Sequence, residues 1–184
     1  VVEAKPDEAI HVELLWNTEG DEDLKDDVGA DLDLHFLWLH PAGLSNKQDI
    51  DEDGEPDAFF DMKWDCYYNN KSPNWGASLD LDDTNGSGPE NVNFKEPSLE
   101  HGYRVGVHYW PENDLGPSDV TLLFYVKGDL IEELHVSNFA KGQMWDAATV
   151  TWDGETAIVE ARVDAEGNPK VIDAYPIPPN LPHP

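Results

Sequence analysis

A nine-residue segment carries aspartates at the spacing of a calcium-binding loop. Residues 49–57 read D-I-D-E-D-G-E-P-D. In an EF-hand loop the ligands stand at positions 1, 3, 5, 7 and 9, and glycine makes the sharp turn at position 6. The expected side-chain ligands are Asp49, Asp51, Asp53 and Asp57, with the backbone carbonyl of Glu55 at position 7 and Gly54 at the turn. Because a hard cation takes about six to eight oxygen ligands, this spacing predicts a Ca²⁺ site.

The end of this segment departs from the EF-hand pattern. Position 12 is Phe60, and the next carboxylate, Asp61, comes one residue later, so Asp61 is the expected closing ligand. Helices are not expected on either side, and the loop resembles the free-standing calcium loops of dockerins and thrombospondin-type repeats. Extracellular sites of this kind have a Kd of about 10⁻⁴ to 10⁻³ M. The alternative is a solvated acidic turn that holds no metal.

A second group of acids is predicted on and near another strand. Asp31, Asp33 and His35 alternate along the chain, so in a strand they lie on one face, opposite the apolar side chains. Adjacent carboxylates repel unless a cation or hydrogen-bond donors lie between them. The acids that would complete a second calcium site are Asp80, Asp82, Asp83 and Glu90. The alternative is that these aspartates only form turns and cap loops.

The elements that must position these residues are strands. Apolar residues alternate with polar ones between clusters of Gly, Pro, Asn and Asp, and no helical periodicity is apparent. The expected strands are residues 10–16, 32–39, 59–68, 78–81, 103–110, 120–126, 130–136, 144–152, 157–163 and 170–174. Strands at this spacing predict an all-β, two-sheet β-sandwich, immunoglobulin-like or jelly-roll-like, over residues 1–174. Residues 17–27 are expected to form an acidic loop, and the proline-rich residues 175–184 an unpacked tail or linker.

Charge narrows the classes of partner. The chain of 184 residues has 39 Asp and Glu against 11 Lys and Arg, a formal net charge of −28. Nucleic acid and anionic membrane surfaces are therefore excluded as expected partners, whereas bound divalent metal or a saline, halophilic habitat would offset the self-repulsion. No apolar stretch is long enough for a membrane span, and the first residues lack the pattern of a signal peptide. The single cysteine, Cys66, does not indicate a compartment.

Three short motifs resemble a known family. A D-x-D-L-H strand, a G-x-G-P-E turn and a Y-x-V-x-V-x-Y strand occur in order at residues 31–35, 86–90 and 103–109. Together they resemble the YfaP-like bacterial secreted domains of unknown function, over about residues 14–126. The resemblance implies an immunoglobulin-like or jelly-roll-like sandwich in exported proteins, with no established reaction. The loop from Asp49 to Asp61 is an insertion relative to this pattern, so its metal role depends on spacing alone.

These observations favour a calcium-binding, non-catalytic binding or adhesion module that is secreted, periplasmic or on the cell surface. Its expected partners are calcium and a carbohydrate or cell-surface protein. The alternative is a carbohydrate-binding module, whose candidate contact residues are Tyr67, Tyr68, Asn70, Trp75 and Trp110. A glycosidase is a third possibility, because two carboxylates suffice for that chemistry. No nucleophile elbow, zinc helix or phosphate loop occurs, and we assign no catalytic residue.

Overall fold

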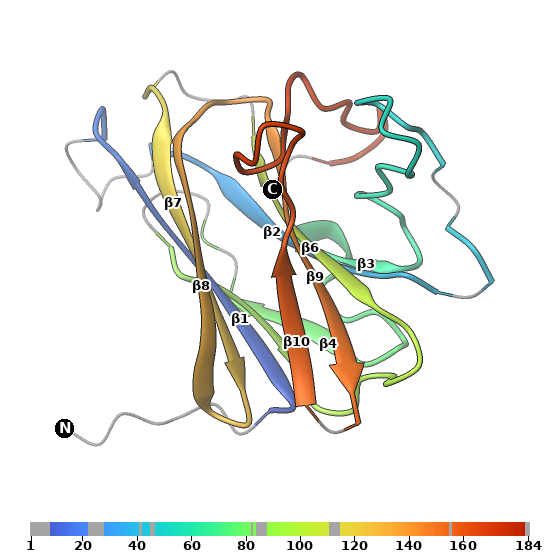
Figure 1. Cartoon of the computed structure of the whole chain (residues 1–184). Coiled ribbons are helices and arrows are strands. Elements are labelled where there is room, and N and C mark those ends of the chain that lie inside the picture. The colour runs from blue at the N-terminus through green and yellow to red at the C-terminus, as the bar shows by residue number, and fades with distance from the viewer. Residues whose placement is uncertain are drawn as a thin grey trace, which may run out of the picture.

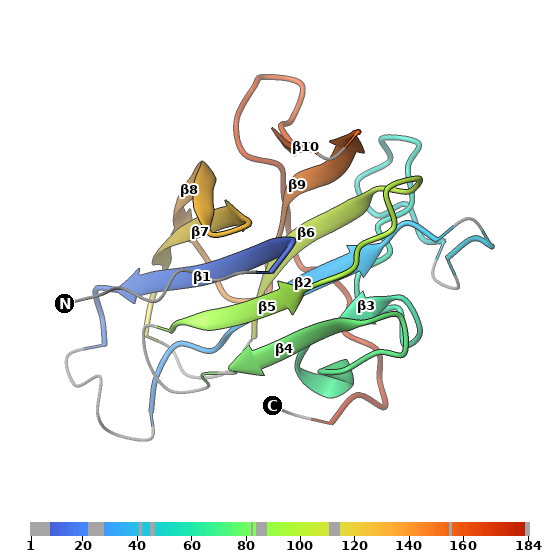
Figure 2. The same ribbon diagram turned by 90° about the horizontal axis from the view of Figure 1, so that it is seen from below.

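Two antiparallel β-sheets pack face to face in the computed structural model (Figures 1 and 2). The structure describes residues 8–21, 28–40, 42–44, 47–81, 83, 88–110, 115–154 and 156–182. The five-stranded sheet has the order β4 (Ala77–Leu81), β5 (Glu90–Phe94), β1 (Ile10–Thr18), β7 (Ser118–Val126) and β8 (Asp129–Phe139). The other sheet has the order β10 (Thr156–Ala161), β9 (Met144–Asp153), β6 (Tyr103–Tyr109), β2 (Leu32–Trp38) and β3 (Asp65–Cys66), and β11 (Val171–Ile172) pairs with β9. The predicted all-β sandwich is confirmed.

Alternation along the strands explains the core between the sheets. In β1 the side chains of Ile10, Val12, Leu14 and Trp16 are buried, and those between them are more exposed. Because successive residues of a strand point to opposite faces, one face of β1 packs inward and the other meets solvent. Burying such side chains supplies the main driving force for folding.

The six-stranded sheet differs, because its central strands are buried on both faces. Leu34 of β2 faces the other sheet, whereas Asp33 and His35, on the opposite face, are also almost fully buried. A layer of loop covers this second face. A Cβ atom on Gly106 of β6 would lie 2.5 Å from the ring of Phe59, so glycine permits that layer to approach the sheet closely. The result is a polar sheet face enclosed beneath residues 57–61.

Several expected elements differ from the observed ones. Residues 59–68 were predicted as one strand, but they form mainly turns around the two-residue β3, followed by a 3-10 helix at Tyr68–Asn70. Strand β5 was not predicted, because its E-N-V-N-F sequence is short and rich in asparagine. Residues 175–182 are extended but packed, with Tyr175 buried and Ile177 and Leu181 against the core. Within the described ranges, no helix is long and apolar enough to cross a membrane.

Candidate metal site

The aspartate loop folds back on itself through its own side chains. The Gly54 N–H donates to Asp49 Oδ2 at 2.9 Å, the Asp53 N–H to Asp51 Oδ1 at 3.3 Å, and the Glu55 N–H to Asp53 Oδ1 at 2.8 Å. Aspartate favours such turns because its side chain accepts from the backbone two residues on. Gly54 has a φ of +91°, the left-handed conformation expected for the turn position.

Asp57 closes the loop and anchors it. Its N–H donates to the Gln48 carbonyl at 2.6 Å, and its carboxylate accepts from the Ile50 N–H at 2.6 Å. Burial raises the pKa of Asp57 above its ordinary value. One ligand oxygen from each of Asp49, Asp51 and Asp57 lies within 4.8 Å of the other two. We call these three residues the Asp cluster; all three are among the predicted ligands.

Three other predicted residues of this segment lie outside the Asp cluster. The carboxylate of Asp53 pairs with Lys170, which holds the pKa of Asp53 below its ordinary value. Asp61 accepts the N–H groups of residues 63 and 64 at 2.9 and 3.1 Å and so caps a turn. Glu55 directs its carboxylate to two arginines, and the expected role of its backbone carbonyl stays a prediction. The structure therefore brings together positions 1, 3 and 9 of the loop.

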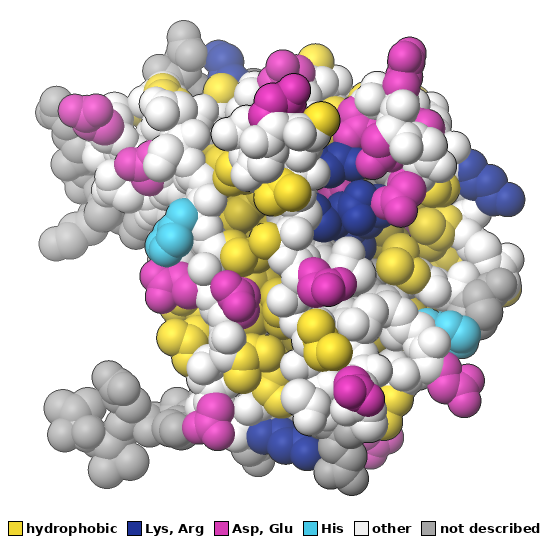
Figure 3. All heavy atoms as spheres, viewed as in Figure 1, with side chains coloured by type: hydrophobic (Ala, Val, Ile, Leu, Met, Phe, Trp, Pro, Cys, Tyr) yellow, Lys and Arg dark blue, Asp and Glu magenta, His cyan; other side chains and the backbone are white. Residues whose placement is uncertain are grey.

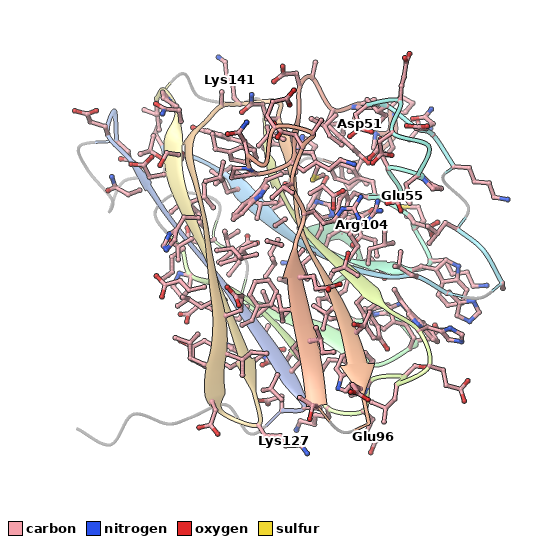
Figure 4. All side chains as sticks on the ribbon, viewed as in Figure 1. Asp51, Glu55, Glu96, Arg104, Lys127 and Lys141 are labelled. Atoms are coloured by element: carbon pink, nitrogen blue, oxygen red, sulfur yellow. The ribbon has the colours of Figure 1, made fainter. Side chains whose placement is uncertain are left out.

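Both arginines of the chain and one lysine gather beside the Asp cluster. Figure 3 shows Lys and Arg side chains next to acidic ones on this face, and Figure 4 labels Arg104 near Glu55 and Asp51. Glu55 accepts from Arg104 at 2.9 Å and from Arg162 at 2.8 Å, and Arg162 also contacts the fully buried Asp146 at 2.7 Å. Asp146 lies 3.6 Å from Arg104 and 3.8 Å from the ammonium of Lys170. Burial raises the pKa of Asp146, although these three cations oppose that shift.

Sequence reasoning missed this cationic group. Arg104 lies on β6, Arg162 follows β10, and Lys170 precedes β11, so no local spacing connects them. The scarcity of arginine was the one sequence feature that could have indicated this group. The chain has 39 acids and only two arginines, and both arginines contact Glu55. Arg162 and Lys170 line a cavity of about 360 Å³, together with Asp53, Glu55 and Glu160. Its walls carry both signs of charge.

The acids predicted for the second calcium site do not form a group like the Asp cluster among the described residues. Asp31 and Asp33 are buried, and Glu90 accepts the Leu34 N–H at 2.7 Å and the Asp83 N–H at 3.3 Å. Asp80 instead binds the side chains of Ser78 and Asn93 on the open face of the other sheet. Asp82 lies outside the described residues. Among the residues that the structure describes, the Asp cluster is the one group of three suitable side chains.

Two histidines lie under the loop layer next to these acids. His35 Nδ1 is 2.7 Å from Asp65 Oδ2, and its ring stacks on Tyr67 with centroids 5.2 Å apart. His108 Nδ1 is 3.8 Å from Asp33 Oδ2, too far for a hydrogen bond. Burial, and secondarily the charge of His35, lowers the pKa of His108 to about 3. His108 is therefore neutral at physiological pH.

The predicted sugar-binding surface is wrong for most of its members. Tyr67, Tyr68 and Trp110 are at most 7% exposed, so their faces are not available for stacking on a sugar. Trp75 is partly exposed, but its indole packs against neighbouring aromatic rings and donates to the Lys63 carbonyl at 3.2 Å. Asn70 donates to the Asp65 carbonyl at 2.6 Å. These side chains support the fold around β3.

No protein-family model and no curated protein matches this sequence. The fold is similar to a solved crystal structure described as that of "unknown function protein SAV2460". The TM-score is 0.56 at 14% sequence identity, and the alignment covers 83% of this chain and 86% of that chain. At this identity the similarity concerns the fold alone.

Proposed function

We propose that the protein is a calcium-binding, non-catalytic module that acts in binding or adhesion outside the cytoplasm. The observation that carries this proposal is the Asp cluster, in which Asp49, Asp51 and Asp57 offer oxygens within 4.8 Å of one another. Carboxylate oxygens are the ligands that calcium prefers, and alternate residues of a tight loop can supply several of them.

The surroundings of the Asp cluster support calcium over a transition metal. The cluster holds carboxylates and neither histidine nor cysteine, which zinc and copper favour. With few ligands and partial exposure, we expect a Kd in the extracellular range of about 10⁻⁴ to 10⁻³ M. Such a site is occupied only where calcium is abundant, and the proposed location outside the cytoplasm follows from this.

The role of calcium would be to hold residues 49–57 in one conformation. Tyr175 donates to the Asp57 carbonyl at 2.8 Å, so the loop contacts the C-terminal segment as well as the sheet. An ordered loop at this end of the sandwich presents a fixed surface to a partner. The resemblance to YfaP-like secreted domains concerns the sandwich and its export, not this inserted loop, and stays a prediction.

Thermal unfolding tests the proposal. We expect about 5 mM calcium to raise the Tm above its value in EDTA, at equal ionic strength, because a ligand that binds only the folded state stabilises it. A matched magnesium sample separates specific binding from screening. Asp51→Asn should abolish the rise, whereas Asp153→Asn, at the exposed end of β9, should retain it. A rise that magnesium reproduces, or that Asp51→Asn keeps, would contradict the calcium site.

A further inference from the structure

The positively charged side chain of Lys170 lies at the edge of the Asp cluster. The Lys170 ammonium lies 2.9 Å from Asp51 Oδ2 and in direct contact with Asp53. Its side chain is only 8% exposed, and Asp146 Oδ2 lies 3.8 Å from the same nitrogen. Three carboxylates, those of Asp51, Asp53 and Asp146, therefore lie around this one ammonium.

The same contacts conflict with a complete calcium loop. Asp51 belongs to the Asp cluster, and Asp53 has the spacing of a fourth ligand but points to the ammonium instead. Calcium binds carboxylate oxygens at about 2.3 to 2.6 Å, so an ion on Asp51 would stand within a few ångströms of the Lys170 nitrogen. Like charges at that separation repel strongly in a partly buried setting.

The chain offers the ammonium an alternative partner. Asp146 is fully buried and already contacts Arg162 at 2.7 Å, and it is the third carboxylate within reach of Lys170. The backbone of Lys170 is held independently, by bonds that link it to Asp146 and Arg162. The side chain can therefore move from the loop toward Asp146 without a change in the strands.

We propose that Lys170 is a built-in competitor of calcium at the Asp cluster, and that its displacement from Asp51 and Asp53 sets the affinity and completes the ligand set. This inference rests on the proposed function and adds to it the residue that regulates the site. Figure 4 shows Asp51 near Glu55 and Arg104, at the end of the sandwich opposite to Lys127. Lys127 is thus a suitable control for the overall loss of one positive charge.

Calcium titration of the full chain by isothermal calorimetry tests the inference. We expect Lys170→Gln to lower the Kd for calcium by about tenfold or more at low ionic strength, because it removes the adjacent positive charge. Lys127→Gln should change the Kd by less than about twofold, because the charge it removes is distant and screened. Lys170→Met keeps the length of the side chain and gives a second charge-free variant if Lys170→Gln does not fold, as judged by circular dichroism.

The outcomes separate this inference from the proposed function. If the wild type binds calcium and neither charge-free variant binds it more tightly, the competitor role is overturned and the site stands. Binding by Lys170→Gln but not by the wild type would support the competitor role and overturn calcium binding as the native function. If neither the wild type nor the variants bind calcium at about 10 mM, both the proposed function and the competitor role are overturned.

Discussion

At the scale of single residues, His108 gives the clearest dependence on pH. Its imidazole is fully buried among Asp33, His35 and aromatic rings, and burial lowers its pKa from 6.5 to about 3. Below about pH 6.5 the unfolded chain binds a proton at this histidine and the folded chain does not. The stability contributed by the neutral imidazole is therefore complete above pH 6.5 and is lost as the pH falls toward 3.

This argument predicts the pH dependence of unfolding. When the pH is lowered from about 7.5 to about 5, protonation of His108 in the unfolded chain should lower the free energy of unfolding by about 2 kcal/mol. His108→Gln should flatten the dependence by that amount, as measured by urea unfolding at both pH values. His135→Gln, at an exposed position, is the matched control for the loss of one histidine side chain. An unchanged slope in His108→Gln would show that the folded protein admits the proton.

At the scale of elements, the C-terminal segment acts as a strap across the six-stranded sheet. The Tyr175 hydroxyl donates to the Asp57 carbonyl at 2.8 Å, and its ring contacts Phe59, Phe60 and His108. The strap and the aspartate loop therefore hold each other over the buried polar face of β2 and β6. Tyr175→Phe removes the hydrogen bond and keeps the ring, so the two contributions can be separated.

We expect Tyr175→Phe to lower the free energy of unfolding by about 1 to 2 kcal/mol, the usual effect of losing a buried hydrogen bond. Deletion of residues 175–184 should cost more, because it also exposes the apolar surface under Tyr175, Ile177 and Leu181. Chemical denaturation of the three proteins in EDTA measures both effects. Equal stability of the deletion variant and the wild type would mean that the strap does not stabilise the domain.

At the scale of the whole molecule, charge governs the response to salt. A net charge of −28 on 184 residues makes the compact state repel itself, and the cationic group beside the Asp cluster offsets only a small part. Monovalent salt shortens the screening length from about 10 Å at 0.1 M to about 3 Å at 1 M. Screening should therefore stabilise the folded protein independently of any metal.

Accordingly, the Tm in EDTA should rise by several degrees between about 0.1 M and about 1 M NaCl, as measured by differential scanning calorimetry. Potassium chloride should act equally, because screening depends on ionic strength. A fall in Tm with salt would instead show that the ion pairs of Arg104, Arg162 and Lys170 outweigh the general repulsion.

Short-range patterns in the sequence predicted most of the strands and the aspartate turn, but not β5 or the turns at residues 59–64. Alternation predicted the inward face of β1, and the D-x-D-x-D-G spacing predicted the turn at Gly54, because both depend on neighbouring residues. Only the tertiary structure decided which carboxylates remain available for a metal. Asp53 meets Lys170 across 117 residues, and Glu55 meets Arg162 across 107, so these distant contacts direct both carboxylates away from the Asp cluster and bring the Lys170 ammonium to its edge at Asp51. Local spacing cannot encode those contacts, since chain packing brings the partners together.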